Sequence, residues 1–376
     1  MANNALGLIF TNLHEENVPE LVRFRTMASI PYGGRYRIID FTLSNMVNSG
    51  ITTVGLMTTN NYRSLIDHIG SGKDWDLARR GGGVTLVSPY RNASGQNAAV
   101  YSTHLEALIS MRETLANSKA DCVVLMDSDY VCNIDLSKVI DSHKKSGKRI
   151  TLVTCPCPRK VQSDSRRLMV GMGAGRTDVV LGSQYDAEHP LLSMNLMVID
   201  MEEVRNIIRE AQAYNFKSLT ANMLIQDSYV RKLNVYHYAG TVFHLNSFEE
   251  YYRSNMELVK NAAVRRELLE DDERRILTSV HNSAPVSYRQ GACVKSSMIA
   301  DDCVIEGTVE NCVLFRGVHI GKGAVVKNSI LFNDTVVGAG ATVSCVVADI
   351  GAVISDGRVL SGCDTLPVYV DKGRRV

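Results

Sequence analysis

Short apolar runs alternate with amphipathic stretches from residue 5 to about residue 240. The apolar runs are nearly continuous and rich in β-branched residues, which predicts strands covered on both faces, as in a largely parallel sheet. Between these runs, apolar residues at helical spacing predict a helix over residues 98–113. The alternation as a whole predicts a doubly wound α/β domain. The predicted strands are residues 5–10, 51–57, 122–127, 150–155 and 196–199.

A further helix start is predicted at D-M-E-E, residues 200–203. Asp200 stands at the N-cap position and Glu203 follows three residues later, which is the spacing of a capping box. In such a box the two side chains satisfy free N–H groups of the first turn. We therefore expect a helix that begins directly after Asp200.

The pattern changes beyond residue 290, where aliphatic residues recur about every six positions. This period predicts a left-handed parallel β-helix of hexapeptide repeats, in which each short strand turns a corner and stacks under the next. Glycines near the corners, as in the pairs that begin at residues 320, 337 and 350, fit such turns.

Three parts are therefore expected along the chain. An α/β domain occupies residues 1–255, and a β-helix domain occupies residues 286–376. Between them, residues 256–285 form a linker helix and loop, because the charged run at 265–275 is typical of a solvated helix.

Composition narrows the range of partners. The length of 376 residues exceeds what one hydrophobic core usually serves, in agreement with two domains. A net charge of +1 without a basic tract argues against nucleic acid or an acidic membrane surface as a partner, and no apolar run reaches the roughly 20 residues that cross a bilayer. Nine scattered cysteines and an N-terminus without the features of a secretion signal predict a cytoplasmic protein with reduced thiols.

One segment carries a specific resemblance. P-Y-G-G-R-Y-R-I-I-D-F-T-L-S-N-M-V-N-S-G-I, residues 31–51, is similar along its length to a segment of the ADP-glucose pyrophosphorylase family, the glucose-1-phosphate adenylyltransferases of bacterial glycogen synthesis. Weaker similarities follow at residues 95–101, 126–131 and 192–199. The resemblance covers nearly the whole chain and implies a Rossmann-like nucleotidyltransferase (GT-A-like) domain followed by the β-helix.

The chain departs from this family first at the phosphate-binding loop. The enzymes hold the triphosphate of ATP while glucose 1-phosphate attacks the α-phosphorus and pyrophosphate leaves. The resemblance implies a loop whose glycines bring backbone N–H groups to the phosphates and whose arginine neutralises the leaving pyrophosphate. In this chain the glycines and the arginine are absent, and a family lysine-proline pair falls on Met27 and Ala28. The loop positions correspond to Asn12, Leu13, His14, Glu15, Glu16 and Asn17.

Glu15 and Glu16 thus replace positions that cradle phosphates in the family. At an effective dielectric constant near 20, two like unit charges about 4 Å apart repel by roughly 4 kcal/mol, which is close to a thousandfold in affinity. The two glutamates can also simply begin a surface helix, but the phosphate cradle is absent in either case. We therefore expect no triphosphate to bind here.

The metal site gives an independent comparison. Asp129 matches the first metal-binding aspartate of the family and follows the strand at 122–127, at the edge where open α/β sheets bind ligands. The second aspartate corresponds to His244, and neutral imidazole is a poor Mg²⁺ ligand. Asp127 is an alternative carboxylate if it faces the same way. We expect His244 to be a packed or surface histidine and no metal site in this chain.

The sugar-binding side is also incomplete. The lysine of the family's E-K-P motif has no counterpart between residues 180 and 190, and no carboxylate remains in N-F-K-S at 215–218. Gly95 and Ser193 match substrate-binding positions, which we interpret as vestigial. Asn195 replaces a glycine at which the family backbone approaches the sugar.

A retained fold with lost site residues resembles the GlgD-type regulatory subunits of this family. The resemblance implies little or no activity for this chain alone and a catalytic GlgC-type partner in a heterotetramer, with Mg²⁺ at the partner's catalytic site. Arg35 and Arg37 match positions that bind anionic sugar-phosphate effectors in the family. Arg37 pairing with Asp40 to stabilise the turn is an equally good interpretation.

Other functions fit parts of the sequence. An active nucleotidyltransferase with a remodelled loop would need cations that do not cluster near the loop in the sequence. A stand-alone sugar-phosphate sensor would form a homo-oligomer indifferent to any catalytic chain. An acyltransferase built on the hexapeptide repeat would need a catalytic histidine, and His319 in a short repeat domain is the lone candidate, so this function is disfavoured.

Overall fold

The computed structural model describes residues 4–13, 15–79, 81–87, 101–156, 167–173, 176–182 and 190–376. By its contacts the chain divides into two compact units. The first unit contains Met1–Leu13 and Thr42–Val242, and the second contains His14–Phe41 and Phe243–Val376. The domain bounds predicted at residues 255 and 285 stay predictions.

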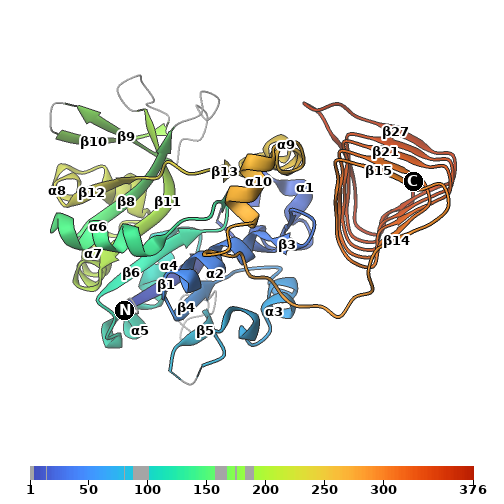
Figure 1. The fold of residues 1–376 in the computed structure, drawn as a ribbon. Helices are drawn as coiled ribbons and strands as arrows, with labels where there is room; N and C mark the ends of the chain where they lie inside the picture. The colour runs from blue at the N-terminus through green and yellow to red at the C-terminus, as the bar shows by residue number, and fades with distance from the viewer. Residues whose placement is uncertain are drawn as a thin grey trace, which may run out of the picture. The chain divides into compact units, whose positions relative to one another are not determined.

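The first unit is built on a mixed nine-stranded sheet (Figure 1). Strand β1 lies between β6 and β4 and is parallel to both, and β5 extends the parallel part beyond β4. On the other side, β11 runs antiparallel to β6 and β8. The strands are β1 (Ala5–Phe10), β4 (Thr53–Met57), β5 (Gly83–Val87), β6 (Cys122–Asp127), β8 (Ile150–Pro156), β9 (Leu168–Gly173), β10 (Arg176–Leu181), β11 (Leu191–Asp200) and β12 (Leu233–His237), with a short β7 (Tyr130–Val131) outside this sheet.

The five predicted strands are confirmed, whereas the largely parallel sheet is wrong on the β11 side. An apolar run indicates that both faces of a strand are buried, but it does not indicate whether the strand runs parallel or antiparallel to its neighbours. Helices α4, α5 and α7 contribute buried side chains that pack with those of β1 and β6 in one core. The helices are α2 (Ile38–Asn48), which continues from the second unit, α3 (Arg63–Ile69), α4 (His104–Ser110), α5 (Arg112–Asn117), α6 (Leu136–Ser146), α7 (Met201–Tyr214) and α8 (Asp227–Val230).

One helix start and one helix cap differ from the sequence prediction. Helix α4 starts only at His104, because the Thr103 side chain accepts a hydrogen bond from the first turn and caps it. Helix α7 begins directly after Asp200 as predicted, but the capping box is wrong, because Asp200 makes no side-chain cap hydrogen bond. Its carboxylate instead accepts from Arg149 (3.1 Å), and Glu203 binds Lys232 (2.6 Å). Both carboxylates are thus engaged with cationic side chains and not with the N–H groups of the first turn.

The second unit contains a parallel β-helix of three five-stranded sheets, drawn as three walls in Figure 1. Aliphatic side chains stack in register along its interior, as in the ladder Val309, Val326 and Val343. The strands are β14 (Ser287–Tyr288), β15 (Cys293–Lys295), β16 (Met298–Ile299), β17 (Val304–Ile305), β18 (Thr308–Glu310), β19 (Val313–Leu314), β20 (His319–Ile320), β21 (Val325–Lys327), β22 (Ile330–Leu331), β23 (Val336–Val337), β24 (Thr342–Ser344), β25 (Val346–Ala348), β26 (Val353–Ile354), β27 (Val359–Ser361) and β28 (Val368–Val370).

Not every corner of the β-helix uses glycine. At one corner, Asn311, Asn328 and Cys345 follow strand residues that pair in register and have φ angles of 53°, 45° and 52°. Asparagine tolerates this left-handed conformation because its short side chain can form hydrogen bonds with the nearby backbone.

Cys312 lies in the interior of the β-helix, and burial raises the pKa of its thiol to about 12.

The N-terminal segment 14–41 packs into the second unit. The backbone of Gly33 and Gly34 has positive φ (59° and 83°), which turns β2 into β3 and favours glycine. Asn255 of α9 accepts the Gly33 N–H (2.9 Å), so α9 holds this turn. The remaining elements of the second unit are η1 (Glu15–Asn17), α1 (Pro19–Val22), η2 (Met27–Ser29), β2 (Pro31–Tyr32), β3 (Tyr36–Arg37), β13 (Phe243–His244), α9 (Phe248–Lys260) and α10 (Ala262–Leu269).

Arg25 joins this segment to the β-helix through a buried ion pair. Its Nη2 lies 2.6 Å from Oδ1 of Asp349, and their side chains are 3% and 1% exposed.

In the described ranges the cysteines are free thiols. No helix in these ranges is long and apolar enough to cross a membrane.

Candidate functional site

Asn12 fastens the end of β1 to the end of β4. Its Oδ1 accepts hydrogen bonds from the Thr58 hydroxyl (3.0 Å), the Thr59 N–H (3.1 Å) and the Thr11 hydroxyl (2.7 Å). Its Nδ2 donates to the carbonyl of Asn60 (3.3 Å). Both polar atoms of the side chain therefore hold backbone in place, at a position where the resembling family has a phosphate-binding glycine.

The next residues form an acidic turn in the second unit. Glu15, Glu16 and Asn17 make up the 3-10 helix η1, with Glu16 exposed and Glu15 half-buried. The Asn17 Nδ2 donates to Oδ1 of Asn246 (2.8 Å), just before α9. Position 17 is thus a neutral amide engaged with another amide. His14 lies outside the described residues.

Two buried carboxylates lie at the carboxyl end of β6. Asp127 Oδ1 is 2.6 Å from Nε2 of His104, the first residue of α4, and that ring packs edge-on against Phe10. Asp129 Oδ2 accepts a hydrogen bond from Nη2 of Arg167 (2.7 Å). Both side chains of the second pair are 1% exposed. Each carboxylate therefore already has a partner on the chain itself.

Arg167 also reaches toward the predicted sugar side. It donates to the Tyr130 hydroxyl, and its guanidinium lies 5.2 Å from the centre of that ring. The Tyr130 hydroxyl in turn donates to the carbonyl of Ser193 (3.0 Å). Ser193 is fully buried and its Oγ accepts the N–H of Asn195 (3.3 Å), which has a φ of 49° at a bulge in β11. The structure thus connects Asp129 and Ser193 through Tyr130 and Arg167.

His104 and Arg167 were not singled out from the sequence. Arg167 is a charged residue directly before the apolar run of β9, which is a weak signal that its side chain becomes buried. Its partner Asp129 is 38 positions away, and His104 is 23 positions from Asp127. Contacts over such separations follow from the fold and not from local pattern.

These residues do not fit the Mg²⁺ ion that the family resemblance implies. Magnesium requires oxygen ligands in nearly octahedral geometry, usually one or two carboxylates with water. Here Asp127 and Asp129 are engaged with His104 and Arg167. In the described part of the chain, no three His, Cys, Asp or Glu side chains group so as to hold a metal. His244 is half-buried in β13 of the second unit.

Arg35 and Arg37 follow the Gly33-Gly34 turn in the second unit. Burial, and secondly the positive charge of Arg35, lower the pKa of the half-buried Arg316, so the two guanidinium groups interact unfavourably. Asp40 accepts the backbone N–H of Arg37 (2.9 Å) and the hydroxyl of Thr278 (2.6 Å). The carboxylate of Asp40 therefore stabilises the turn through the backbone of Arg37.

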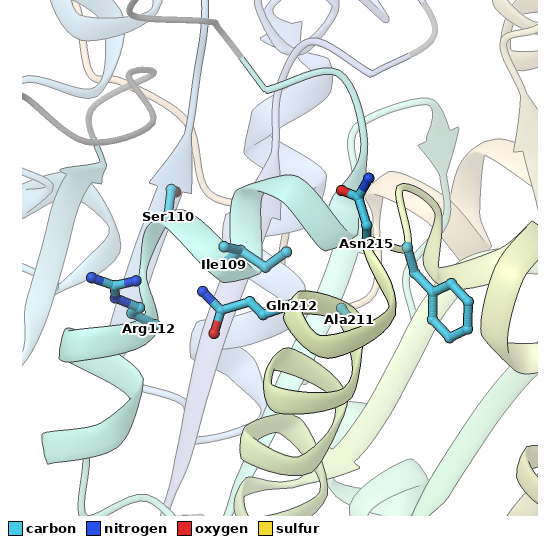
Figure 2. A pocket seen from close by; sticks show the side chains of 7 residues that line it. Ile109, Ser110, Arg112, Ala211, Gln212 and Asn215 are labelled. Atoms are coloured by element: carbon cyan, nitrogen blue, oxygen red, sulfur yellow. The ribbon is translucent and has the colours of Figure 1, made fainter. Parts of the chain in front are cut away.

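A separate pocket of about 290 Å³ lies in the first unit. Figure 2 shows Ser110 and Arg112, from α4 and α5, on one side and Gln212 and Asn215, from the end of α7, on the other. The predicted site residues do not line this pocket. The predicted substrate-binding Gly95, and most of the segment where the E-K-P lysine is missing, lie outside the described residues.

Comparison with known proteins bears on both halves of the chain. Residues 22–165 match the nucleotidyl transferase family, and residues 282–365 match the GlmU-like C-terminal hexapeptide family. The chain is 33% identical over 372 residues to the glycogen biosynthesis protein GlgD of Bacillus subtilis, covering 99% of this chain and 96% of that protein. The chain belongs to the GlgD family.

Further relatives place this GlgD-family chain beside a group of enzymes. A GlgD of Geobacillus stearothermophilus is 34% identical over 329 residues, covering 87% of this chain and 84% of the relative. The glucose-1-phosphate adenylyltransferase of Halalkalibacterium halodurans is 29% identical over 338 residues, covering 87% and 85%. The resemblance and the two-part fold predicted from the sequence are thereby confirmed.

Proposed function

We propose that this GlgD-family chain is a regulatory subunit in glycogen biosynthesis with little or no catalytic activity of its own. Its partner is a GlgC-type catalytic glucose-1-phosphate adenylyltransferase chain, joined with it in a heterotetramer, and Mg²⁺ belongs to the partner's site. The observation that carries this proposal is that Asn12, at a position where the family has a phosphate-binding glycine, is tied to the end of β4 within the first unit.

Adenylyl transfer needs positive charge and free N–H groups around the triphosphate as charge develops on the leaving pyrophosphate. Asn12 directs its amide to the backbone and hydroxyl groups of Thr58, Thr59 and Asn60. Two further loop positions of the family are occupied in the sequence by Glu15 and Glu16, which lie in the η1 turn of the second unit. A carboxylate about 4 Å from a phosphate charge costs roughly 4 kcal/mol, so ATP binding would weaken about a thousandfold.

A sugar-phosphate effector is proposed to bind at Arg35 and Arg37. Support comes from Arg316, whose pKa is lowered first by burial and then by the charge of Arg35. A bound phosphate would relieve the repulsion between these cations. Effector binding is therefore favoured on this face of the second unit, with no need for a functional catalytic site.

Mixing the two kinds of chain tests the proposal. ADP-glucose formation from ATP and glucose 1-phosphate is measured with this chain alone, with the catalytic chain alone and with both chains together. We expect background turnover for this chain alone, because its triphosphate site is lost. The mixture is expected to differ from the catalytic chain alone in turnover or in effector response, and the two chains are expected to elute together on gel filtration.

Two outcomes would replace the proposal with another function. Turnover by this chain alone that matches the catalytic chain would identify an active nucleotidyltransferase with a remodelled loop. Separate elution together with unchanged turnover in the mixture would instead favour a stand-alone sugar-phosphate sensor.

A further inference from the structure

We infer that Arg167 is a resident cation at the β6 carboxylates, so that the chain binds no divalent metal ion there. Its guanidinium forms an ion pair with Asp129, the carboxylate at the position of a metal ligand in the related enzymes. The inference rests on the proposed function in one respect, which is that this chain carries out no metal-dependent catalysis at the site. It adds which side chain excludes the metal.

The first support is the burial of the pair. Arg167 Nη2 and Asp129 Oδ2 are 2.7 Å apart, and each side chain is 1% exposed. A charge-assisted hydrogen bond at this distance is among the strong ones in proteins. A metal ion that captured Asp129 would leave the guanidinium buried without its counter-charge, which is strongly unfavourable. The metal would therefore have to displace the guanidinium from a buried ion pair.

The second support is that Arg167 is held from its other side. It donates to the Tyr130 hydroxyl and lies over the face of that ring. The Tyr130 hydroxyl donates its own proton to the Ser193 carbonyl (3.0 Å). The hydroxyl oxygen is then the acceptor for Arg167. This chain of contacts fixes the guanidinium on Asp129.

The third support is the neighbouring carboxylate. Asp127 is the alternative ligand at this edge, and its Oδ1 lies 2.6 Å from Nε2 of His104. His104 is itself fixed by edge-on packing against Phe10 (4.6 Å between ring centres) and by its place at the start of α4. A metal ion would therefore have to break two internal contacts to gain two carboxylates.

Binding of Mn²⁺, a paramagnetic probe for such sites, tests the inference on the full chain by electron paramagnetic resonance. The wild-type chain is expected to bind no Mn²⁺ at this edge. Arg167→Gln frees Asp129 and is expected to raise the affinity at least tenfold and create one site per chain. Arg167→Lys keeps the positive charge and is expected to bind no Mn²⁺ at this edge. Adding Asp129→Asn to Arg167→Gln is expected to abolish the new site.

Arg149→Gln is the matched control, because Arg149 pairs with Asp200 at the surface (52% and 29% exposed) and its loss should create no site. Wild-type Mn²⁺ binding that Asp129→Asn removes would overturn the inference. So would a folded Arg167→Gln chain that gains no Mn²⁺. If Arg167→Gln folds poorly, a melting temperature that rises with Mn²⁺ supports the inference and one that does not rise overturns it. These readouts do not involve ADP-glucose, so their failure leaves the mixing result intact.

Discussion

Asp349→Asn is expected to lower the free energy of unfolding of the second unit by about 3–5 kcal/mol, the usual cost of breaking a buried ion pair. Asp349 lies 2.6 Å from Arg25 and also accepts the hydroxyl of Tyr369 (2.5 Å). The substitution keeps the size of the side chain but leaves the Arg25 guanidinium, 3% exposed, without a counter-charge. Chemical denaturation, followed by circular dichroism, measures the change.

Asp371→Asn provides the control for this prediction. Asp371 pairs with Arg23 at 3.4 Å, but the two side chains are 34% and 64% exposed, so its loss is expected to cost at most about 1 kcal/mol. Equal effects of the two substitutions would contradict the assigned role of Arg25. The double variant Arg25→Met with Asp349→Leu is expected to regain much of the lost stability, because apolar pairs often replace buried ion pairs without loss.

Restoring three family residues together, by Glu15→Gly, Asn17→Arg and His244→Asp, is expected to recover little ADP-glucose formation. Asn12 still binds the end of β4, Arg167 still occupies Asp129, and the sugar-binding lysine is still missing. Loss of metal catalysis alone removes several kcal/mol of transition-state stabilisation. Turnover is therefore expected to stay below about a thousandth of that of a catalytic relative, since about 4 kcal/mol corresponds to a thousandfold.

A coupled assay for pyrophosphate release measures this turnover, with the unmodified chain as background. The thermal melting of the variant serves as the folding control. Full activity of the triple variant would show that the sugar side and Arg167 do not limit the reaction, and the account of the site would then be wrong.

The sequence predicted the fold well because its signals were local. Apolar runs marked the strands of the first unit, and the six-residue period marked the β-helix, since both patterns report burial at fixed spacing. Strand direction is not encoded in this way, so the sheet was expected to be largely parallel, whereas β11 runs antiparallel to β6. Asp200 was expected to cap α7, but its fold-dependent contact with Arg149 prevailed.

For the candidate site, the sequence predicted which family residues are missing, but not which contacts replace them. The missing glycines around Asn12 are visible in the sequence, but the hydrogen bonds that give Asn12 its structural role reach Thr58 and Asn60, more than 40 residues away. Arg167 became part of the site only when the sheet brought it to Asp129. Such replacement contacts depend on tertiary packing and cannot be predicted from local sequence. A missing motif, by contrast, can be detected in the sequence alone.

The central claim is that this chain does not hold a triphosphate beside β1, and calorimetric titration of the chain alone with ATP and Mg²⁺ tests it most directly. Because Asn12 is engaged and Glu15 and Glu16 are acidic, we predict no saturable binding. Saturable one-to-one binding, with a Kd in the range of enzyme KM values, about 1 μM to 1 mM, would contradict the account.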